Sequence, residues 1–304
     1  MPLTKFLDPK NDYAFRKIFG TEKNKDILIK FLNDMVVFKE GKPIVDVTFL
    51  KTIQDPEISS KKTSVVDILC TDQDQNTYVV EMQVASHKGF EKRAQYYAAK
   101  AYVSQMDKGG KYENLKEVIF LAIANFTMFP QKTSYKSDHV ILDRDNHQHD
   151  LKDFSFTFLE LEKFHKTITE LSSMIEKWCY YFKHAQETTP EDLDRIIGQD
   201  LVIKRAYEEL DRFYWREEEL LAYEDALKKD RDYESSMEQK YDEGKAEGRA
   251  EGIQEGEKRG IEKGMSEALI KVALNLLQQG TSVQNIASAT GLSVQDIQQL
   301  KGDF

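Results

Sequence analysis

An unbroken apolar run, Val118–Ala124, constrains the fold of this 304-residue chain more than any other segment. The run is rich in β-branched and aromatic residues, so it predicts a strand in the centre of a sheet. Other strands are predicted over residues 44–50, 139–142 and 154–159, and helices over residues 12–19, 25–35 and 90–106. Strands and helices in this order predict an α/β fold, a mixed sheet with helices on its faces.

Two further apolar segments, 65–70 and 78–84, flank a polar stretch that is typical of a turn. Side chains alternate along a strand, so Glu81 and Gln83 share one face, and Asp67 can face Glu81 across an antiparallel pair. Carboxylate and carbonyl oxygens suit Mg²⁺ or Mn²⁺. The alternative is an amphipathic hairpin whose polar residues face water. Asp67 interrupts an apolar run, which favours the cation site, because a buried carboxylate is costly unless it is paired or binds a metal.

The net charge of −10 is unevenly distributed along the chain. Residues 191–270 hold 24 Asp and Glu against 14 Lys and Arg, a net charge of −10, so the remainder of the chain sums to zero. Phosphate attraction depends on local charge, so a neutral domain with a basic rim is compatible with nucleic acid. The basic residues of residues 1–66 include Lys10, Arg16, Lys17, Lys61 and Lys62.

No apolar run is long enough to span a bilayer, and the first residues lack a signal-peptide core, so we expect a cytoplasmic protein without a membrane partner. Two cysteines and six scattered histidines do not make a familiar zinc site.

After residue 160 the pattern is helical, with helices expected near 167–186, 191–212 and 213–234. Glycine then recurs at every fourth position, at Gly244, Gly248, Gly252, Gly256, Gly260 and Gly264, a segment that we call the glycine ladder. Six interior glycines cost an isolated helix about 6 kcal/mol relative to alanine. Such a helix needs a partner packed along the glycines, which predicts a homodimeric helix pair; the alternative is a disordered linker. The segment is too charged to insert in a membrane.

The last residues resemble a small helix-turn-helix, with Ser282 and Ser293 as N-caps and Gly280 and Gly291 as stops. Residues 272–300 contain no Lys or Arg, whereas a protein that reads DNA needs cations for the phosphates. We therefore expect this module to pack on a partner or on the tail helix. The predicted parts of the chain are a sheet domain over 1–165, a helical region over 166–234, the glycine-ladder helix over 235–271 and the small helical module over 272–304.

The pattern Asp67…Glu81-Met82-Gln83 resembles the core of the PD-(D/E)XK nucleases, in the version with glutamine in place of the usual lysine. The opening residues 8–20, the stretch 93–97 with Tyr102 and Gln105, and the glycine ladder resemble the recombination-promoting nuclease (Rpn) family, whose members are called transposases. This resemblance covers nearly the whole chain. It implies a restriction-endonuclease-like fold for residues 1–165.

The resemblance also implies site residues. Asp67, Glu81 and the backbone carbonyl of Met82 would hold Mg²⁺ or Mn²⁺, and Gln83 would occupy the place of the lysine without supplying its charge. The implied catalytic residues are Asp67, Glu81, Gln83 and Asp12, and the candidate substrate contacts are Gln95, Tyr96, Arg16 and Lys17. Asp12 is also explained as an acid at a helix N-terminus, where the helix dipole favours it. Gln95 and Tyr96 need no function as helix residues.

The implied function is that of a metal-dependent DNA endonuclease, which hydrolyses phosphodiester bonds in recombination, mobile-element or phage-defence settings. The alternative is a DNA-binding or regulatory dimer that keeps the nuclease fold with weak or lost catalysis, a hypothesis that the uncharged Gln83 supports. A transposase with strand transfer is less favoured, because the sequence shows no wider acidic triad.

Overall fold

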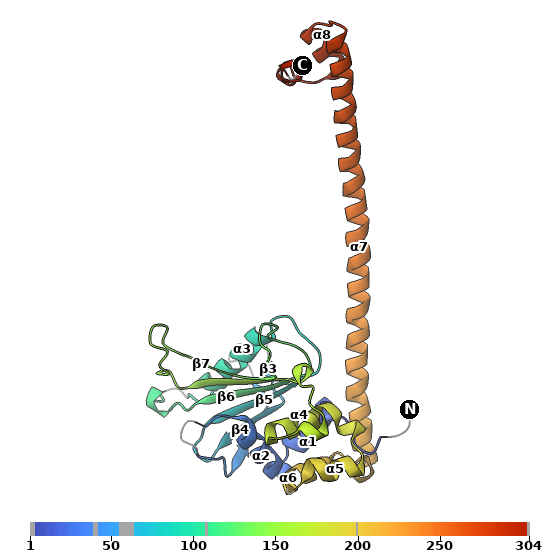
Figure 1. The fold of residues 1–304 in the computed structure, drawn as a ribbon. Helices are drawn as coiled ribbons and strands as arrows, with labels where there is room; N and C mark the ends of the chain where they lie inside the picture. Colours follow the sequence, from blue (N-terminus) through green and yellow to red (C-terminus); the bar gives the residue numbers. More distant parts are fainter. Residues whose placement is uncertain (1–3, 39–41, 55–63, 107–108, 199, 303–304) are drawn as a thin grey trace. The chain divides into compact units, whose positions relative to one another are not determined.

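The computed structural model describes residues 4–38, 42–54, 64–106, 109–198 and 200–302. The chain divides into two compact units, Met1–Arg231 and Asp232–Phe304, and each is considered by itself (Figure 1). Lys61 and Lys62 of the expected basic rim lie outside the described residues. In the described part of the chain, no helix combines the length and the apolar character needed to cross a membrane.

The first unit contains a six-stranded mixed sheet with the strand order β1-β4-β5-β6-β8-β7. The strands are β1 (Val47–Phe49), β4 (Ile68–Asp72), β5 (Thr77–Gln83), β6 (Val118–Ala124), β7 (Lys136–Val140) and β8 (Phe154–Glu160). Strand β6 is buried along its whole length and runs parallel to β5 and β8, while the other neighbours are antiparallel. The predicted central strand is therefore confirmed. A separate pair joins β2 (Ile53–Gln54) to β3 (Ser64–Val65).

Hydrogen bonds in the turn stabilise the hairpin of β4 and β5. The Asp72 carboxylate accepts hydrogen bonds from the backbone N–H groups of Asp74 and Asn76 and from the hydroxyl of Tyr78. Gln75 adopts a left-handed backbone conformation, with φ of 66°. The resulting register pairs Ile68 with Val80, so that Asp67, the residue before β4, lies beside the end of β5.

Helices cover both faces of this sheet (Figure 1). Helix α3 (Phe90–Val103) packs its buried residues, including Ala94 and Ala98, against one face. The other face carries the larger core, to which α1, α2, α4, α5 and α6 contribute. These helices span Asp12–Phe19, Lys25–Met35, Met174–His184, Pro190–Ile197 and Leu201–Glu209. The predicted mixed sheet between helices is confirmed, and α1 and α2 have the predicted bounds.

Several predicted bounds were wrong. Strand β1 is shorter than residues 44–50. Strand β7 spans Lys136–Val140 rather than residues 139–142, because its polar first residues pair with the neighbouring strand β8. Helix α3 ends at Val103 rather than at residue 106, and α4 begins at Met174, where Ser173 and Glu176 form a capping box. The helix expected over 191–212 is two helices, with Gly198 at a φ of 55° after the first.

Helix α7 (Glu217–Gln278) joins two segments that the sequence analysis treated separately. It includes the whole glycine ladder, so the helix prediction for the ladder is confirmed. It also includes most of the helix predicted over 213–234, which begins at Glu217 because a 3₁₀ turn occupies Arg212–Tyr214. Helices α4 to α6 bury residues in the same core as α1, α2 and the sheet. The four-part division of the chain stays a prediction.

In the second unit, α8 (Val283–Thr290) and α9 (Val294–Gly302) follow the end of α7. Ser282 caps α8, the Ser293 hydroxyl oxygen accepts a hydrogen bond from the backbone N–H of Asp296 at the start of α9, and Gly291 between the helices has a φ of 72°. Ala273 of α7, Ile286 and Ile297 form a small buried cluster. The module therefore packs on the tail helix, which is one of the two arrangements predicted for it.

Candidate active site

The backbone bends at Asp67, between β3 and β4, and the bend directs the Asp67 side chain toward β5. Its Oδ2 atom accepts a hydrogen bond of 2.8 Å from the backbone N–H of Met82. The Asp67 carboxylate thus takes the place of a backbone carbonyl as acceptor at the point where the backbone hydrogen bonds between β4 and β5 end. Asp67 is held beside Glu81 and Met82 by this bond, which confirms the proximity that the strand pattern predicted.

Arg16 of α1 lies on the same carboxylate. Its Nη2 atom donates to Asp67 Oδ1 at 2.9 Å and lies 2.9 Å from Asp12 Oδ1. Asp12 is about half exposed, whereas the Asp67 side chain is only 10% exposed. Asp12 is therefore linked to Asp67 by Arg16, which pairs with both carboxylates.

Glu81 is the most unusual group of the site. It is only 3% exposed, and one of its oxygens, Oε1, is buried without a hydrogen-bond partner among the described residues. The other oxygen, Oε2, accepts a hydrogen bond of 3.1 Å from Gln83 Nε2. Glu81 and Gln83 thus share the face of β5 that α3 covers, as the alternation along the strand predicted, although this face is buried rather than exposed to water.

Gln83 connects Glu81 to a second arginine. Its Nε2 atom also donates to the Met82 carbonyl at 3.0 Å, and its Oε1 atom accepts a hydrogen bond from Arg93 Nη2. The Arg93 guanidinium lies over the rings of Phe90 and Tyr97, with its Cζ atom 4.8 and 5.9 Å from the ring centroids. The three side chains Glu81, Gln83 and Arg93 form one hydrogen-bonded series.

Burial sets the electrostatics of the two carboxylates. Burial raises the pKa of Asp67, and the hydrogen bonds from Met82 and Arg16 lower it only in part. Burial and the neighbouring charge of Asp67 raise the pKa of Glu81 well above its usual value, although the charges of Arg93 and Arg16 and the nearby backbone of Asp67 act in the opposite direction. A cation placed between these two adjacent buried carboxylates would stabilise their charged forms.

These residues fit a divalent metal ion. The partnerless Oε1 of Glu81, the Asp67 carboxylate and the Met82 carbonyl are hard oxygen donors, and Mg²⁺ is commonly bound by one or two carboxylates together with phosphate oxygens. In the described part of the chain, no group of three or more His, Cys, Asp or Glu side chains could hold a metal ion. The donors that the site could offer to a metal are two carboxylates and a carbonyl.

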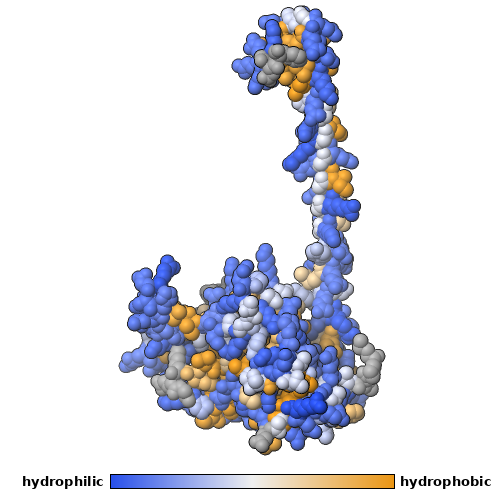
Figure 2. Space-filling model, in the orientation of Figure 1, coloured by the Kyte–Doolittle hydropathy of each residue, from blue (hydrophilic) through white to orange (hydrophobic). Residues whose placement is uncertain are grey.

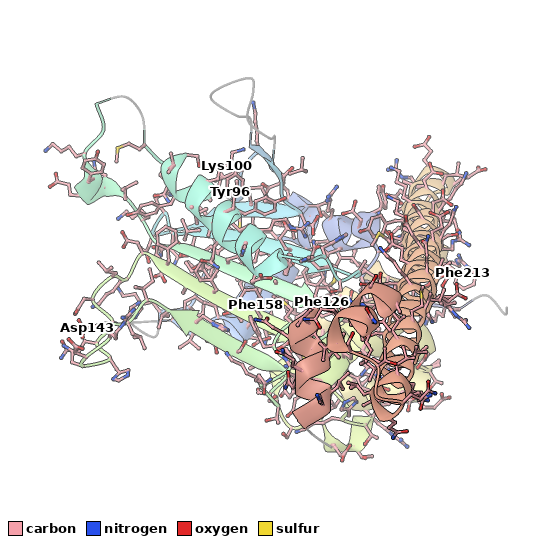
Figure 3. The ribbon with its side chains drawn as sticks, turned by 90° about the horizontal axis from the view of Figure 1, so that it is seen from above. Tyr96, Lys100, Phe126, Asp143, Phe158 and Phe213 are labelled. Atoms are coloured by element: carbon pink, nitrogen blue, oxygen red, sulfur yellow. The ribbon has the colours of Figure 1, made fainter. Side chains whose placement is uncertain are left out.

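The other predicted substrate contacts lie apart from these carboxylates. Lys17 pairs with Glu219, and its ammonium group lies 4.9 Å from the centroid of the Trp215 ring, so it ties α1 to the start of α7. Gln95 is exposed and donates to the backbone carbonyl of Glu91 in its own helix. Tyr96 is 49% exposed on α3 (Figure 3). Of this group, only Arg16 contacts the site.

The opening segment of the chain has a structural role around α1. Asn11 caps α1 by accepting from the backbone N–H groups of Tyr13 and Ala14, and its own amide donates to the carbonyl of Tyr223. Lys10 donates to the carbonyl of Phe182 at 2.9 Å. These contacts fix the position of α1, and so of Arg16, against the rest of the first unit.

The sequence analysis gave Arg93 no role. Arg93 precedes Tyr97 by four residues, which places the two side chains on one side of a helix, and this spacing is the signal that could have marked the pair. Its contact with Gln83 could not be read from the sequence, because it depends on how α3 lies across β5.

The comparisons with known proteins agree with this geometry. The family model described as "PD-(D/E)XK nuclease family transposase" matches residues 9–240, and the one described as "Rpn/YhgA-like nuclease family, C-terminal HTH domain" matches residues 266–302. Comparison with curated proteins and with solved structures gives no match. The mixed sheet between helices is the restriction-endonuclease-like fold that the sequence predicted. Because the first match covers most of the chain, the protein belongs to the PD-(D/E)XK nuclease family transposases, in the Rpn branch that ends in a helix-turn-helix domain.

Proposed function

We propose that this protein is a metal-dependent DNA endonuclease that hydrolyses phosphodiester bonds. The observation that carries the proposal is the buried Oε1 of Glu81, which has no hydrogen-bond partner among the described residues and lies beside a second buried carboxylate. An isolated buried carboxylate oxygen is costly, and a cation offsets that cost. Membership in a nuclease family supports the same conclusion.

Asp67, Glu81 and the Met82 carbonyl would hold Mg²⁺ or Mn²⁺. When bound, the metal would polarise the scissile phosphate and lower the pKa of a water molecule. In the hydrolysis, a bond forms between the water oxygen and phosphorus, and the bond from phosphorus to the leaving sugar oxygen breaks. Gln83 can orient the water or a phosphate oxygen by hydrogen bonding. Arg16, held by Asp12 and Asp67, presents a positive charge beside the carboxylates.

A shallow cavity of about 430 Å³ next to Arg16 supports a path for the DNA backbone. Its lining includes Arg16, Lys17, Lys23 and Asn24, which belong to α1 and the residues after it. Lys17 and Lys23 are also paired with Glu219 and Glu209, so their charges are partly compensated. Arg16 is also paired, with Asp12 and Asp67, but it lies directly on the site carboxylate. We propose for this position that Arg16 is the phosphate contact nearest the site and that Lys17, Gln95 and Tyr96 are secondary contacts.

A second candidate function is a DNA-binding or regulatory dimer with weak or lost catalysis. Two observations favour it: Gln83 is uncharged, and Arg16 already lies on the Asp67 oxygen that a metal would use. In both functions we propose DNA as the partner, a homodimer formed through the glycine ladder, and a role in recombination, mobile elements or phage defence. The helix-turn-helix match favours DNA binding, whereas the lack of Lys and Arg over residues 272–300 supports phosphate contacts in another part of the chain.

A plasmid assay tests the proposal. The full-length protein is incubated with supercoiled plasmid and Mg²⁺ or Mn²⁺, together with Asp67→Ala, Glu81→Ala and the control Asp74→Ala. Asp74 is an exposed carboxylate in the turn of the same hairpin. We expect nicking by the wild type and the control, and a loss of at least about 100-fold in the two site variants, since even outer contacts of a metal site are worth 10- to 100-fold.

Nicking that survives both site substitutions would overturn the site assignment. DNA binding by the wild type without nicking under either metal would support the second candidate function instead.

A further inference from the structure

Arg93 differs from the other arginine of the site in its partners. Arg16 is neutralised by two carboxylates, Asp12 and Asp67. Arg93 has no carboxylate within ion-pair distance among the described residues, and its Nη2 atom donates to the neutral side chain of Gln83. Its Nε atom is buried and has no hydrogen-bond partner in the described part of the chain. Arg93 therefore makes no direct ion pair in the described part of the chain, although its charge acts on Glu81, and its buried Nε–H is left without an acceptor.

The position of Arg93 is built into the fold. Phe90 and Tyr97, on the same helix, hold the guanidinium by cation–π contacts. Helix α3 carries buried Ala94 and Ala98 against the sheet, and these small residues allow the close approach that brings Arg93 to the end of β5. The guanidinium thus acts on a carboxamide that in turn contacts Glu81 Oε2 and the Met82 carbonyl.

We propose that Arg93 supplies from α3 the positive charge that Gln83 cannot supply from β5, fixing the orientation of the Gln83 carboxamide and offering a guanidinium donor other than the buried Nε–H to a nonbridging phosphodiester oxygen. This inference rests on the proposed nuclease function. The carboxamide orientation follows from the hydrogen bonds: a guanidinium only donates, so Gln83 turns its oxygen to Arg93 and its NH₂ group to Glu81 and Met82. Arg93 is thus a positioning residue for Gln83 and a binding residue for phosphate.

Variants of the whole chain that remove the positive charge of Arg93, or move it to position 83, test this inference. Arg93→Met removes the charge while keeping an apolar stem against Phe90 and Tyr97, and Arg93→Lys keeps the charge without the planar fork. The double variant Gln83→Lys with Arg93→Met puts a lysine ammonium group on β5 in place of the charge removed from α3. Lys92→Met is the matched control, because it removes the same charge from an exposed position one residue earlier on α3. Plasmid nicking with Mn²⁺, and binding of a short DNA duplex in EDTA at several salt concentrations, are measured for each variant.

We expect Arg93→Met to slow nicking by about 100-fold, the size of effect seen when one fixed donor to a transition-state charge is removed. The salt slope of DNA binding should fall by about 1, as for one lost phosphate contact. The nicking rate of Arg93→Lys should lie between those of the wild type and Arg93→Met. The double variant Gln83→Lys with Arg93→Met should nick faster than Arg93→Met alone, and Lys92→Met should nick at nearly the wild-type rate. A purely structural Arg93 would not be rescued by a lysine at position 83.

The possible failures are distinguishable. If the wild type nicks DNA and Arg93→Met nicks equally well, the inference is overturned and the nuclease function stands. If the wild type binds DNA without nicking it, an unchanged affinity and salt slope in Arg93→Met overturns the inference, and a reduced slope supports its phosphate-binding part. A wild type that neither binds nor nicks DNA overturns both proposals. Should Arg93→Met fail to fold, Arg93→Gln removes the charge while keeping a donor to Gln83, and the same criteria apply.

Discussion

Gly20 of the first unit and the glycines of the glycine ladder occupy opposite kinds of surroundings. A Cβ atom added at Gly20, after α1, would lie 2.8 Å from the carbonyl oxygen of Arg16 and 3.5 Å from Ile68 Cγ1. At each of the six ladder glycines, an added Cβ would meet nothing within 4 Å among the described residues. Contacts within the chain explain Gly20. The ladder glycines have no such explanation inside one copy of the described chain.

The apolar residues of the ladder show the same difference. Ile253, Ile261 and Met265 each follow a ladder glycine and are 54 to 64% exposed, and Figure 2 shows separate hydrophobic spots along a mostly hydrophilic helix. Comparable residues of the first unit, such as Ile18, are fully buried. A four-residue repeat exceeds the 3.6 residues of a helical turn, so the stripe advances by about 40° with each repeat. A second helix that follows the stripe would have to coil around it with a right-handed twist.

The largest expected effect on stability is in the glycine ladder. Its sign differs between a ladder helix that is free and one that packs against a second copy of the chain. The triple variant Gly248→Ala, Gly252→Ala, Gly256→Ala should stabilise a free helix by about 3 kcal/mol, because each glycine costs about 1 kcal/mol relative to alanine. If a second copy packs along the glycines, the added methyl groups should weaken the dimer instead. Sedimentation equilibrium of the full-length protein, with circular dichroism melts at two concentrations, separates these results.

We expect the dimer to weaken in this triple variant. Glu247→Ala, a change on the same helix that leaves the glycines in place, serves as the control. A wild-type protein that sediments as a monomer at high concentration would contradict the dimer proposal.

The next effect is a loss of stability in the first unit. Gly20→Ala places a methyl group against the backbone of α1, which cannot move away cheaply, so we expect a loss of about 1–3 kcal/mol in the free energy of unfolding. For a unit of this size, that corresponds to a decrease in Tm of about 2–4 °C per kcal/mol. Denaturant unfolding of the full-length protein measures the change, and a stability equal to wild type would mean that Gly20 is as free as the ladder glycines.

The smallest expected change in Tm at neutral pH is that of Glu81→Gln, measured in EDTA. The pKa of Glu81 is raised on folding, so the folded state binds this proton more tightly than the unfolded state, and stability falls as pH rises from the unfolded value near 4.5 through the raised folded value. A glutamine has no proton to lose. The variant and the wild type should therefore have similar Tm values near pH 4, and the variant should become the more stable of the two as pH rises.

Differential scanning fluorimetry across this pH range measures both proteins. Added Mn²⁺ should raise the Tm of the wild type at high pH and leave Glu81→Gln nearly unchanged, since binding to the folded state stabilises it. A Tm difference that does not depend on pH would show that Glu81 is not the group responsible.

Much of the fold could be predicted because its signals are local. The apolar run of β6, the helical spacing of α1 and α2 and the capping residues around α8 depend only on neighbouring residues. The edge strand β7 was misplaced because its burial comes from its neighbour β8 and not from its own composition. The break between α5 and α6 was missed because apolar spacing continues on both sides of Gly198.

The candidate site was predictable in part for a similar reason. Alternation along β5 and the turn at 72–76 were enough to bring Asp67, Glu81 and Gln83 together. Arg16 was expected as part of a basic rim and as a candidate substrate contact, and its contact with Asp67 depends on where Asn11 and Tyr223 hold α1. Gln95 and Tyr96 belong to the same stretch as Arg93, but the rotation of α3 places Arg93 at the site and leaves the other two exposed.

The sequence by itself determined the strand and helix types, the nuclease family and the pair of carboxylates, because periodicity, turns and motifs are properties of short stretches. Only the tertiary structure decided which charges surround that pair. The two arginines come from helices on opposite faces of the sheet, and packing over long sequence distances sets their positions. The same packing leaves Glu81 Oε1 buried without a hydrogen-bond partner among the described residues, because contacts between distant segments determine burial.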